Sequence, residues 1–247
     1  MVEKKQELIV SIHQPSYWPW FGLLYKIAVS DSFVILDDVA TNKATNQYRN
    51  IFFCNGKEKY LTLPINYKMG IKLIDLEFKN DLYIDDHVSK LENYYRKAPF
   101  YSEGISIVKK IFLKNHVKPI DLIIDTMMSL METFLIKTKL SRSSDLKKVG
   151  AKDDLVLEIC RALSADTYIS GMGGLNYMKN YDKFDESGIN IRFIKYTPII
   201  YKQSPEFRFV PGLSAIDLIM FNGVEQSQKI FRENFSKIEL LEKEQVL

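Results

Sequence analysis

The amino-acid sequence predicts an α/β protein, with a mostly parallel sheet, flanking helices, a β-hairpin and a helical insertion. A strand, a short helix and a second strand follow one another between residues 8 and 39, and such a crossover joins parallel strands. Asn55-Gly56 between two β-rich runs is the strongest short-range signal of a hairpin. Three helical stretches between residues 84 and 140 predict the insertion.

The first part of the chain is expected to supply the strands. Residues 8–12 are apolar and β-branched, and Gln14-Pro15 ends this strand. Residues 20–30 carry apolar side chains at helical spacing, and residues 32–39 form a second buried strand that ends on two carboxylates. Further strands are expected at residues 50–54, 59–65 and 71–78.

The pattern becomes helical from about residue 84 onward. Breaks at Ala98-Pro99 and Lys118-Pro119 separate helices at residues 85–97, 102–114 and 119–137. We expect one domain over residues 1–247, with a helical subdomain at about 84–140. The remaining elements are expected as a helix at 153–164, strands at 167–169 and 189–196, and a helix at 213–221 that Asn222-Gly223 terminates.

The charges are nearly balanced, with 34 Lys and Arg against 31 Asp and Glu spread along the chain. No nucleic-acid partner is expected, because such proteins usually gather basic residues on one face. Cys54 and Cys160 lie far apart, which fits a reduced compartment and predicts neither a disulfide framework nor a zinc site. Residues 8–12 are too short for a signal-peptide core, and acidic side chains interrupt residues 120–136 as in a core helix. We therefore expect a soluble, cytoplasmic protein without a membrane span.

The segment from His13 to Trp20 follows the first strand and precedes the first helix. Ligands of open α/β sheets bind at the carboxyl ends of the strands, where a histidine can act as a general base near neutral pH. We therefore take His13 as a catalytic candidate, with Gln14, Tyr17 and Trp20 as substrate-binding candidates. The alternative is a structural aromatic corner in which the backbone satisfies the histidine.

Asp37 and Asp38 end the second strand, so they are expected at the same edge of the sheet as His13. Adjacent strand residues point to opposite faces, so one aspartate faces the site while the other pins a loop. The sequence leaves open which aspartate does which. Both are catalytic candidates that would orient the imidazole, bind a cation or accept a hydrogen bond. The alternative is a solvated turn.

Two further segments offer polar groups to a substrate. Gln47, Arg49 and Asn50 enter the hairpin, where the Arg fork suits phosphate and the amides suit sugar hydroxyls. A surface ion pair is the alternative for the arginine. Ser170-Gly171 opens the glycine-rich loop 170–174, which either presents backbone N–H groups to an anion or makes a tight turn. The loop matches neither the Walker lysine motif nor the dinucleotide fingerprint.

The other chemically capable residues predict no metal and no other cofactor. His87 and His116 lack the spacing of metal ligands. Cys160 lies among apolar residues of a helix, where core packing is the expected role.

The order and spacing of these segments resemble the WbqC-like proteins of bacterial surface-polysaccharide gene clusters. The first two matching segments are the most specific, and the resemblance covers nearly the whole chain. It rests on His13-Gln14-Pro15, Tyr17, Pro19-Trp20, Gly22, Phe33-Val34, Leu36-Asp37-Asp38-Val39, Gln47, Arg49-Asn50, Leu61-Thr62, Pro64, His87, Tyr95, Tyr168, Ser170-Gly171, Tyr201, Gln203, Leu213-Ser214, Asp217-Leu218 and Asn222-Gly223.

The resemblance implies a role in making O-antigen or a related glycan of lipopolysaccharide. It also adds His87, Tyr201 and Gln203 to the expected substrate-binding residues. Tyr48, where the family commonly has Asn, and the looser Met172-Gly173-Gly174 run are departures from the pattern. They bear on substrate choice rather than on the fold.

From these residues we predict a transferase that moves an acyl or aminoacyl group to the amino group of a nucleotide-linked amino sugar. His13 would remove the amine proton, Asp37 or Asp38 would orient the imidazole or the amine, and Arg49 would meet phosphate. A thioester of CoA or of an acyl-carrier protein would supply the acyl group. Two alternatives stay open: nucleotidyl transfer, although the second histidine of an HxGH motif is missing, and a non-catalytic sugar-nucleotide-binding partner. A homodimer is also left open.

Overall fold

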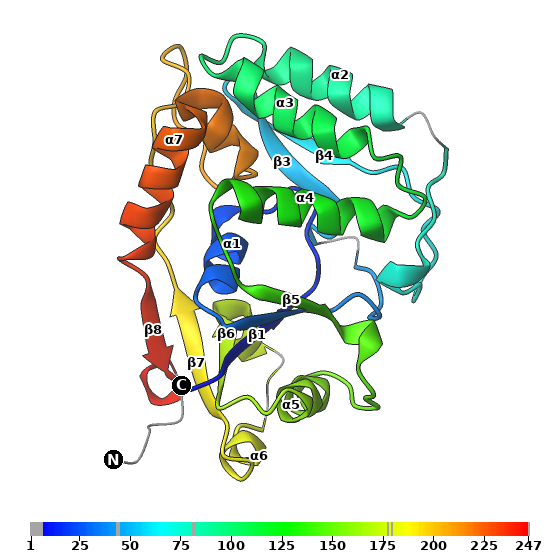
Figure 1. Cartoon of the computed structure of the whole chain (residues 1–247), viewed down its shortest axis with the longest axis vertical. Helices are drawn as coiled ribbons and strands as arrows, with labels where there is room; N and C mark the ends of the chain where they lie inside the picture. Colours follow the sequence, from blue (N-terminus) through cyan, green and yellow to red (C-terminus); the bar gives the residue numbers. More distant parts are fainter. Residues whose placement is uncertain (1–6, 43–44, 81–82, 177, 179, 247) are drawn as a thin grey trace.

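The computed structural model describes the chain except for residues 1–6, 43–44, 81–82, 177, 179 and 247 (Figure 1). Within the described residues, the main sheet has six strands in the order β5-β2-β1-β6-β7-β8. Neighbours from β5 to β7 run parallel, and β8 runs antiparallel to β7 at one edge. The predicted α/β class is confirmed. The strands are β1 (Ile9–His13), β2 (Ser32–Ile35), β5 (Lys139–Arg142), β6 (Thr167–Gly171), β7 (Asn190–Lys195) and β8 (Glu239–Glu242).

Alternation along the strands divides the apolar core between the two faces of the sheet. Phe33 of β2 packs in the larger cluster together with helix α1 (Phe21–Ala28). Its neighbour Val34 belongs to the second cluster, which includes helices α5 (Asp153–Ala162) and α6 (Asp182–Asp185). Figure 1 shows α1 above the sheet and α5 and α6 below it, so the sheet is covered on both faces.

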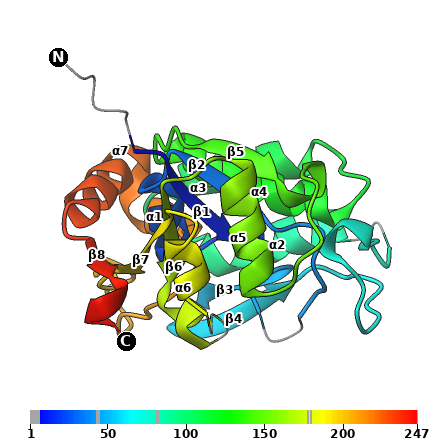
Figure 2. The same cartoon turned by 90° about the horizontal axis from the view of Figure 1, so that it is seen from below.

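The predicted hairpin and helical insertion are both present. Asn55 and Gly56 form the hairpin turn with φ values of 50° and 75°, which suits a primed turn between twisted strands. The hairpin strands form a separate two-stranded sheet that lies above the main sheet in Figure 1 and crosses the lower part of the view in Figure 2. These elements are β3 (Arg49–Cys54), β4 (Lys57–Thr62), α2 (Tyr83–Tyr95), α3 (Tyr101–Phe112) and α4 (Pro119–Thr133).

Helix α7 (Ile216–Phe235) is longer than the sequence predicts. Gly223 has φ 74° and ψ 167° and interrupts the helix where a terminator is expected, but the chain then resumes a helical course. A side chain at this glycine would also place its Cβ 2.7 Å from the Phe100 ring. The glycine is therefore required both for its backbone conformation and for the close approach of the loop before α3.

The expected strand at residues 71–78 is wrong. Leu73–Asp75 forms a short 3-10 helix, and only isolated bridges flank it, such as Ala40 with Lys72. The backbone of this segment is hydrogen-bonded to the loop after β2 instead of to a neighbouring strand: Ile74 N donates to the Asp37 carbonyl at 2.8 Å. That loop begins earlier than predicted, since β2 ends at Ile35. The edge strands β5 and β8 are absent from the sequence prediction.

The apolar stretch at residues 119–137 forms α4, which ends earlier than predicted, at Thr133. Leu135 then takes a positive φ of 58°, which ends the helical course. In the part of the chain that the structure describes, no helix combines the length and apolar character needed to cross a bilayer.

The strand order has one reversal, which lies between β1 and β6. The chain proceeds outward from β1 through β2 to β5, then crosses to the other side of β1 to form β6 and β7. In chain order the parallel strands are thus arranged 3-2-1-4-5, as in doubly wound nucleotide-binding folds. Ligands of such sheets bind outside the carboxyl ends of the strands at the reversal. The fold therefore points to the ends of β1 and β6.

Candidate functional site

The crevice between the ends of β1 and β6 is the candidate site. The ladder joining these strands stops at Ser11 and Ile169, although each strand continues for two more residues. The strands therefore separate toward their carboxyl ends. His13, Gln14 and Gly171 lie at this opening, and all three are half-buried.

His13 is neutral at physiological pH, with one ring nitrogen available. Its Nδ1 lies 2.7 Å from the Gln14 carbonyl oxygen, which can only accept, so Nδ1 carries the hydrogen and Nε2 keeps a lone pair. Burial lowers the pKa of the imidazole to about 4, and the nearby charge of Lys26 lowers it further. The Trp20 indole packs at an edge-on angle with ring centroids 6.1 Å apart. A carbonyl rather than Asp37 or Asp38 therefore fixes this ring.

An amide pair holds Gln14 beside the histidine. Gln47 is almost fully buried and its Nε2 donates to Gln14 Oε1 at 2.6 Å. The Gln47 Oε1 accepts the Asn42 backbone N–H at 2.9 Å, which fixes the amide orientation. Gln47 thus positions Gln14, and Gln14 is the member of the pair that can reach a ligand.

Asn50 serves the loop that carries these residues. It is fully buried, and its Nδ2 donates to the Tyr17 and Trp18 carbonyls at 3.1 and 2.6 Å. The amide thereby satisfies backbone groups of residues 14–20 from the hairpin, so we assign Asn50 to loop anchoring rather than ligand contact.

Tyr17 and His87 form a second anchor in the interior. The His87 Nε2–H donates to the Thr62 carbonyl at 3.1 Å, so Nδ1 accepts the Tyr17 hydroxyl at 2.8 Å. Burial lowers the pKa of His87 to about 4 and keeps it neutral. Both side chains are at most 1% exposed, so we assign them to anchoring the loop rather than to ligand contact.

Replacing Tyr17 by Phe is expected to lower the free energy of unfolding by about 1–3 kcal/mol, because His87 Nδ1 would lose its only described partner while buried. Urea denaturation measures the change. Tyr60→Phe, at a ring 52% exposed, is the control and is expected to match the wild type. An unchanged midpoint for Tyr17→Phe would contradict the anchoring role.

Asp37 is fully buried, and both of its carboxylate oxygens accept hydrogen bonds. Burial alone would raise its pKa, but hydrogen bonds from Arg142 and Ser144 hold the pKa below its usual value. The carboxylate therefore stays ionised and ties the end of β2 to the segment after β5. Its donors are Arg142 Nε at 2.6 Å, Ser144 N at 2.9 Å and Ser144 Oγ at 2.8 Å.

Asp38 has a similar set of partners on the same segment. It accepts from Lys148 Nζ at 2.7 Å and from the Ser143 hydroxyl. Burial would raise its pKa, and these two donors hold it below the usual value. Neither aspartate is recorded in contact with His13. The alternative of a freely solvated turn does not describe them either.

Ser170 and the glycines after it shape the other wall of the crevice. Ser170 is buried and its hydroxyl donates to the Gly171 carbonyl at 3.0 Å. A Cβ at Gly174 would lie 2.1 Å from this hydroxyl, so Gly174 is required for packing. A Cβ at Gly171 or Gly173 would meet nothing within 4 Å, so their backbone is open to a ligand.

Tyr201 and Gln203 belong to a buried cluster around Asp217, the residue at the start of α7. Tyr201 donates to Asp217 Oδ2 at 2.6 Å and Gln203 Nε2 donates to the same oxygen at 2.9 Å. Burial raises the pKa of Asp217 to about 6, against the effect of these hydrogen bonds. Gln203 also binds both backbone groups of Val210. The cluster fixes the segment before α7.

Arg49 lies on the hairpin, where its guanidinium stacks on an aromatic ring. Its guanidinium lies 4.7 Å over the Tyr60 ring, and its buried Nε has no hydrogen-bond partner among the described residues. Stacking keeps the fork oriented while leaving donors for an anion.

The sequence profile of the WbqC-like protein family matches residues 14–229, which is most of the chain. The chain belongs to the WbqC-like family. No curated protein and no solved structure matches it. At the level of the family, the match supports an association with polysaccharide biosynthesis. The matched range contains every predicted site residue except His13, which lies one position before it.

An apolar cavity of about 170 Å³ in this WbqC-like protein is lined in part by Trp20, whose ring also packs against His13. Two lining residues have their polar groups engaged with protein partners. The Tyr201 hydroxyl donates to Asp217, and the Trp20 indole is hydrogen-bonded to Tyr196. The exposed faces therefore offer apolar contact. The lining residues are Trp20, Phe21, Tyr196, Pro198, Ile199, Tyr201, Phe209, Pro211, Gly212 and Leu213.

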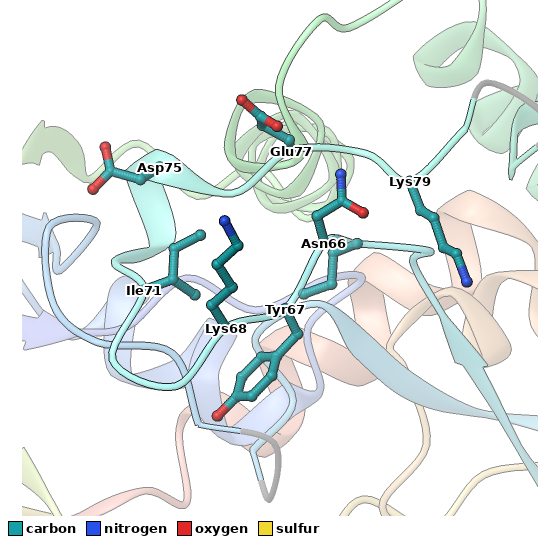
Figure 3. A pocket seen from close by; sticks show the side chains of 8 residues that line it. Asn66, Tyr67, Lys68, Ile71, Asp75, Glu77 and Lys79 are labelled. Carbon is teal, nitrogen blue, oxygen red and sulfur yellow. The ribbon is translucent and has the colours of Figure 1, made fainter.

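A larger hollow of about 580 Å³ lies over residues 65–79 (Figure 3). Lys68 lies between Ile71 and Asn66, whereas Asp75 and Lys79 sit at opposite sides of the hollow. None of the predicted site residues lines it. The candidate site is therefore assigned to the ends of β1 and β6, where the strand order reverses.

Sequence reasoning missed three basic residues of the WbqC-like fold at this end of the sheet. Arg142 ends β5, an edge strand with little apolar signal, and Lys148 lies shortly after it, so the sequence did not predict the partners of the aspartates. Lys26 is 4% exposed and lies between Leu23 and Ile27 on the buried face of α1. A lysine at a position where the helical period requires an apolar residue is the signal that would have found it.

In the described part of the chain, no group of three or more His, Cys, Asp or Glu side chains is arranged to hold a metal ion.

Proposed function

We propose that this protein is a transferase of bacterial surface-polysaccharide biosynthesis that adds an acyl or aminoacyl group to the amine of a nucleotide-linked amino sugar. His13 is the observation that carries the proposal. It presents an unprotonated Nε2 at the strand reversal, where a doubly wound sheet binds nucleotides.

The chemistry asks for one proton acceptor next to the sugar nitrogen. The unprotonated amine attacks the carbonyl carbon of a thioester, and the C–N bond forms as the C–S bond breaks. The nitrogen proton passes to His13 Nε2 and from there to the departing thiolate. A base held neutral by burial is available for this at pH 7, and a bound anion beside it would raise its proton affinity.

The neighbouring residues suit substrate binding around this base. Gln14 offers an amide to a sugar hydroxyl, and Trp20 offers an aromatic face beside the apolar cavity. Arg49 offers a stacked guanidinium fork to an anionic or hydroxyl group of the substrate. We assign the imidazole-orienting role to the Gln14 carbonyl, and we assign Asp37 and Asp38 to the support of the sheet edge.

Incubating the protein with UDP- and dTDP-linked amino sugars and a panel of acyl and aminoacyl thioesters tests the proposal. We expect a product whose mass is increased by the acyl group, detected by mass spectrometry. Donors should include both CoA and acyl-carrier-protein thioesters. Absence of an acylated product with every donor and sugar would overturn acyl transfer.

Nucleotidyl transfer is a second candidate, and the 3-2-1-4-5 strand order with a histidine at the end of the first strand favours it. It predicts pyrophosphate release from a nucleoside triphosphate and a sugar phosphate. A non-catalytic sugar-nucleotide binder would instead bind the nucleotide sugar without turnover in the wild type. His13→Ala distinguishes an enzyme from a binder. In an enzyme that uses His13 as a base, the variant loses turnover but still binds the nucleotide sugar.

A further inference from the structure

Lys26 carries a buried ammonium group into the sheet at the strand reversal. It is 4% exposed on α1, and its Nζ donates to the Ile12 carbonyl at 2.7 Å. The Tyr168 ring of β6 lies 5.8 Å from the same nitrogen. The amine is therefore in contact with both strands that border the crevice.

The direction of the Ile12 carbonyl places the amine in the gap between these strands. Leu36 N donates to the His13 carbonyl at 2.9 Å, so the His13 carbonyl faces β2. Successive carbonyls of a strand point to opposite sides, so the Ile12 carbonyl faces β6. The β1–β6 ladder has already ended at Ser11 and Ile169. Lys26 thus occupies the place of the next ladder donor, at the floor of the crevice.

The charge of this lysine has no opposite charge beside it. Among the described residues, no carboxylate is paired with the amine. The groups that interact with it are the Ile12 carbonyl, the Tyr168 ring, the Cys160 thiol and the His13 imidazole. Burial lowers the pKa of Lys26 to about 7. An ammonium group has three hydrogens, and one acceptor is recorded here. Up to two donors stay available for a ligand.

A buried lysine without a counter-charge is costly to the fold, and Met or Leu would fill the position at lower cost. Such groups are found where a binding site needs the charge. The ligand that matches is an anion, because it would supply both the missing charge and the missing acceptors. The open backbone of Gly171, on the other strand, lets such an anion approach closely.

We propose that Lys26 and the Gly171 backbone form a phosphate-binding subsite at the floor of the crevice, which takes the diphosphate of the nucleotide-linked substrate. The identity of the diphosphate rests on the proposed function, but the anion site itself does not. Arg49 would then meet a different part of the substrate, since its guanidinium is stacked on the hairpin.

Titration calorimetry with inorganic pyrophosphate and with UDP tests this subsite without any acyl donor. Lys26→Met is expected to weaken both ligands by at least about tenfold, the value of one charge-assisted hydrogen bond. Its melting temperature without ligand is expected to equal or exceed that of the wild type, because the uncompensated charge is removed. Lys90→Met, at an exposed lysine of α2, is the matched control.

Equal affinities of Lys26→Met and wild type for pyrophosphate and UDP would overturn the subsite, as would absence of binding by the wild type. A subsite that binds pyrophosphate in a protein without acyl transfer would instead leave this inference standing and remove the proposed function.

Gly171→Ala provides a second variant in case Lys26→Met does not fold. Its added methyl group meets nothing within 4 Å, so the fold is expected to keep its stability. Pyrophosphate binding should weaken by at least about threefold, because the methyl group would hold the anion away from the backbone. Wild-type affinity in Gly171→Ala would contradict the subsite.

Discussion

Replacing Asp37 by Ala is expected to lower the free energy of unfolding by about 3–5 kcal/mol, the cost of breaking a buried ion pair. The substitution removes the acceptor of hydrogen bonds from Arg142 and Ser144. It also leaves Arg142 beside the buried end of β2 without its closest counter-charge. The effect is large because a fully buried side chain joins two strands of the sheet.

Urea denaturation followed by circular dichroism measures this loss. Asp145→Ala changes an exposed aspartate of the same segment and is expected to stay within about 0.5 kcal/mol of the wild type. Asp37→Asn keeps the shape and is expected to fall between the two. If Asp37→Ala kept the wild-type midpoint and lost activity instead, a catalytic role for Asp37 would return.

Replacing His13 by Asn is expected to reduce kcat for acyl transfer by about 10²–10⁴-fold, the usual contribution of a general base. The Asn amide can still donate to the Gln14 carbonyl, as Nδ1 does, but it has nothing at the place of Nε2. The loop should therefore keep its course while the proton acceptor is lost.

Steady-state kinetics with the amino-sugar nucleotide measures kcat and KM separately. A fall in kcat with KM changed less than about threefold would support the base role, because ground-state binding is then retained. His116→Asn changes a histidine paired with Asp125, outside the crevice, and should keep the wild-type kcat. Equal kcat for His13→Asn and wild type would remove His13 from the chemistry.

The interior of the fold could be predicted because local patterns and global packing agree there. The strand predicted at residues 8–12 is β1 at Ile9–His13, and Asn55-Gly56 forms the hairpin turn. The edge strands could not be predicted. β5 has the sequence Lys-Leu-Ser-Arg and β8 has Glu-Leu-Leu-Glu, and half-exposed edge strands bury too few side chains to show a pattern.

The segment at residues 71–78 was mispredicted for a related reason. Its alternating side chains fit a strand, but Leu73 N and Ile74 N bond the carbonyls of Val39 and Asp37. Those carbonyls lie more than thirty residues earlier in the chain. A local period therefore could not reveal that the backbone is held by a distant loop.

The sequence predicts where the candidate site lies better than it predicts the roles of the residues there. Parallel strands end at one sheet edge, which brings His13 and the aspartates to the same side. The hydrogen-bond partners could not be predicted from the sequence, because Arg142 lies 105 residues from Asp37 and His87 lies 70 residues from Tyr17. These long-range contacts decide which polar residues hold the fold and which face the crevice.

A crystal structure with a UDP-linked amino sugar tests most directly whether the crevice between β1 and β6 is the binding site. The diphosphate is predicted within about 3 Å of Lys26 Nζ and the Gly171 backbone, with the sugar amine at a similar distance from His13 Nε2. A ligand seated in the hollow over residues 65–79, with the crevice empty, would contradict this assignment.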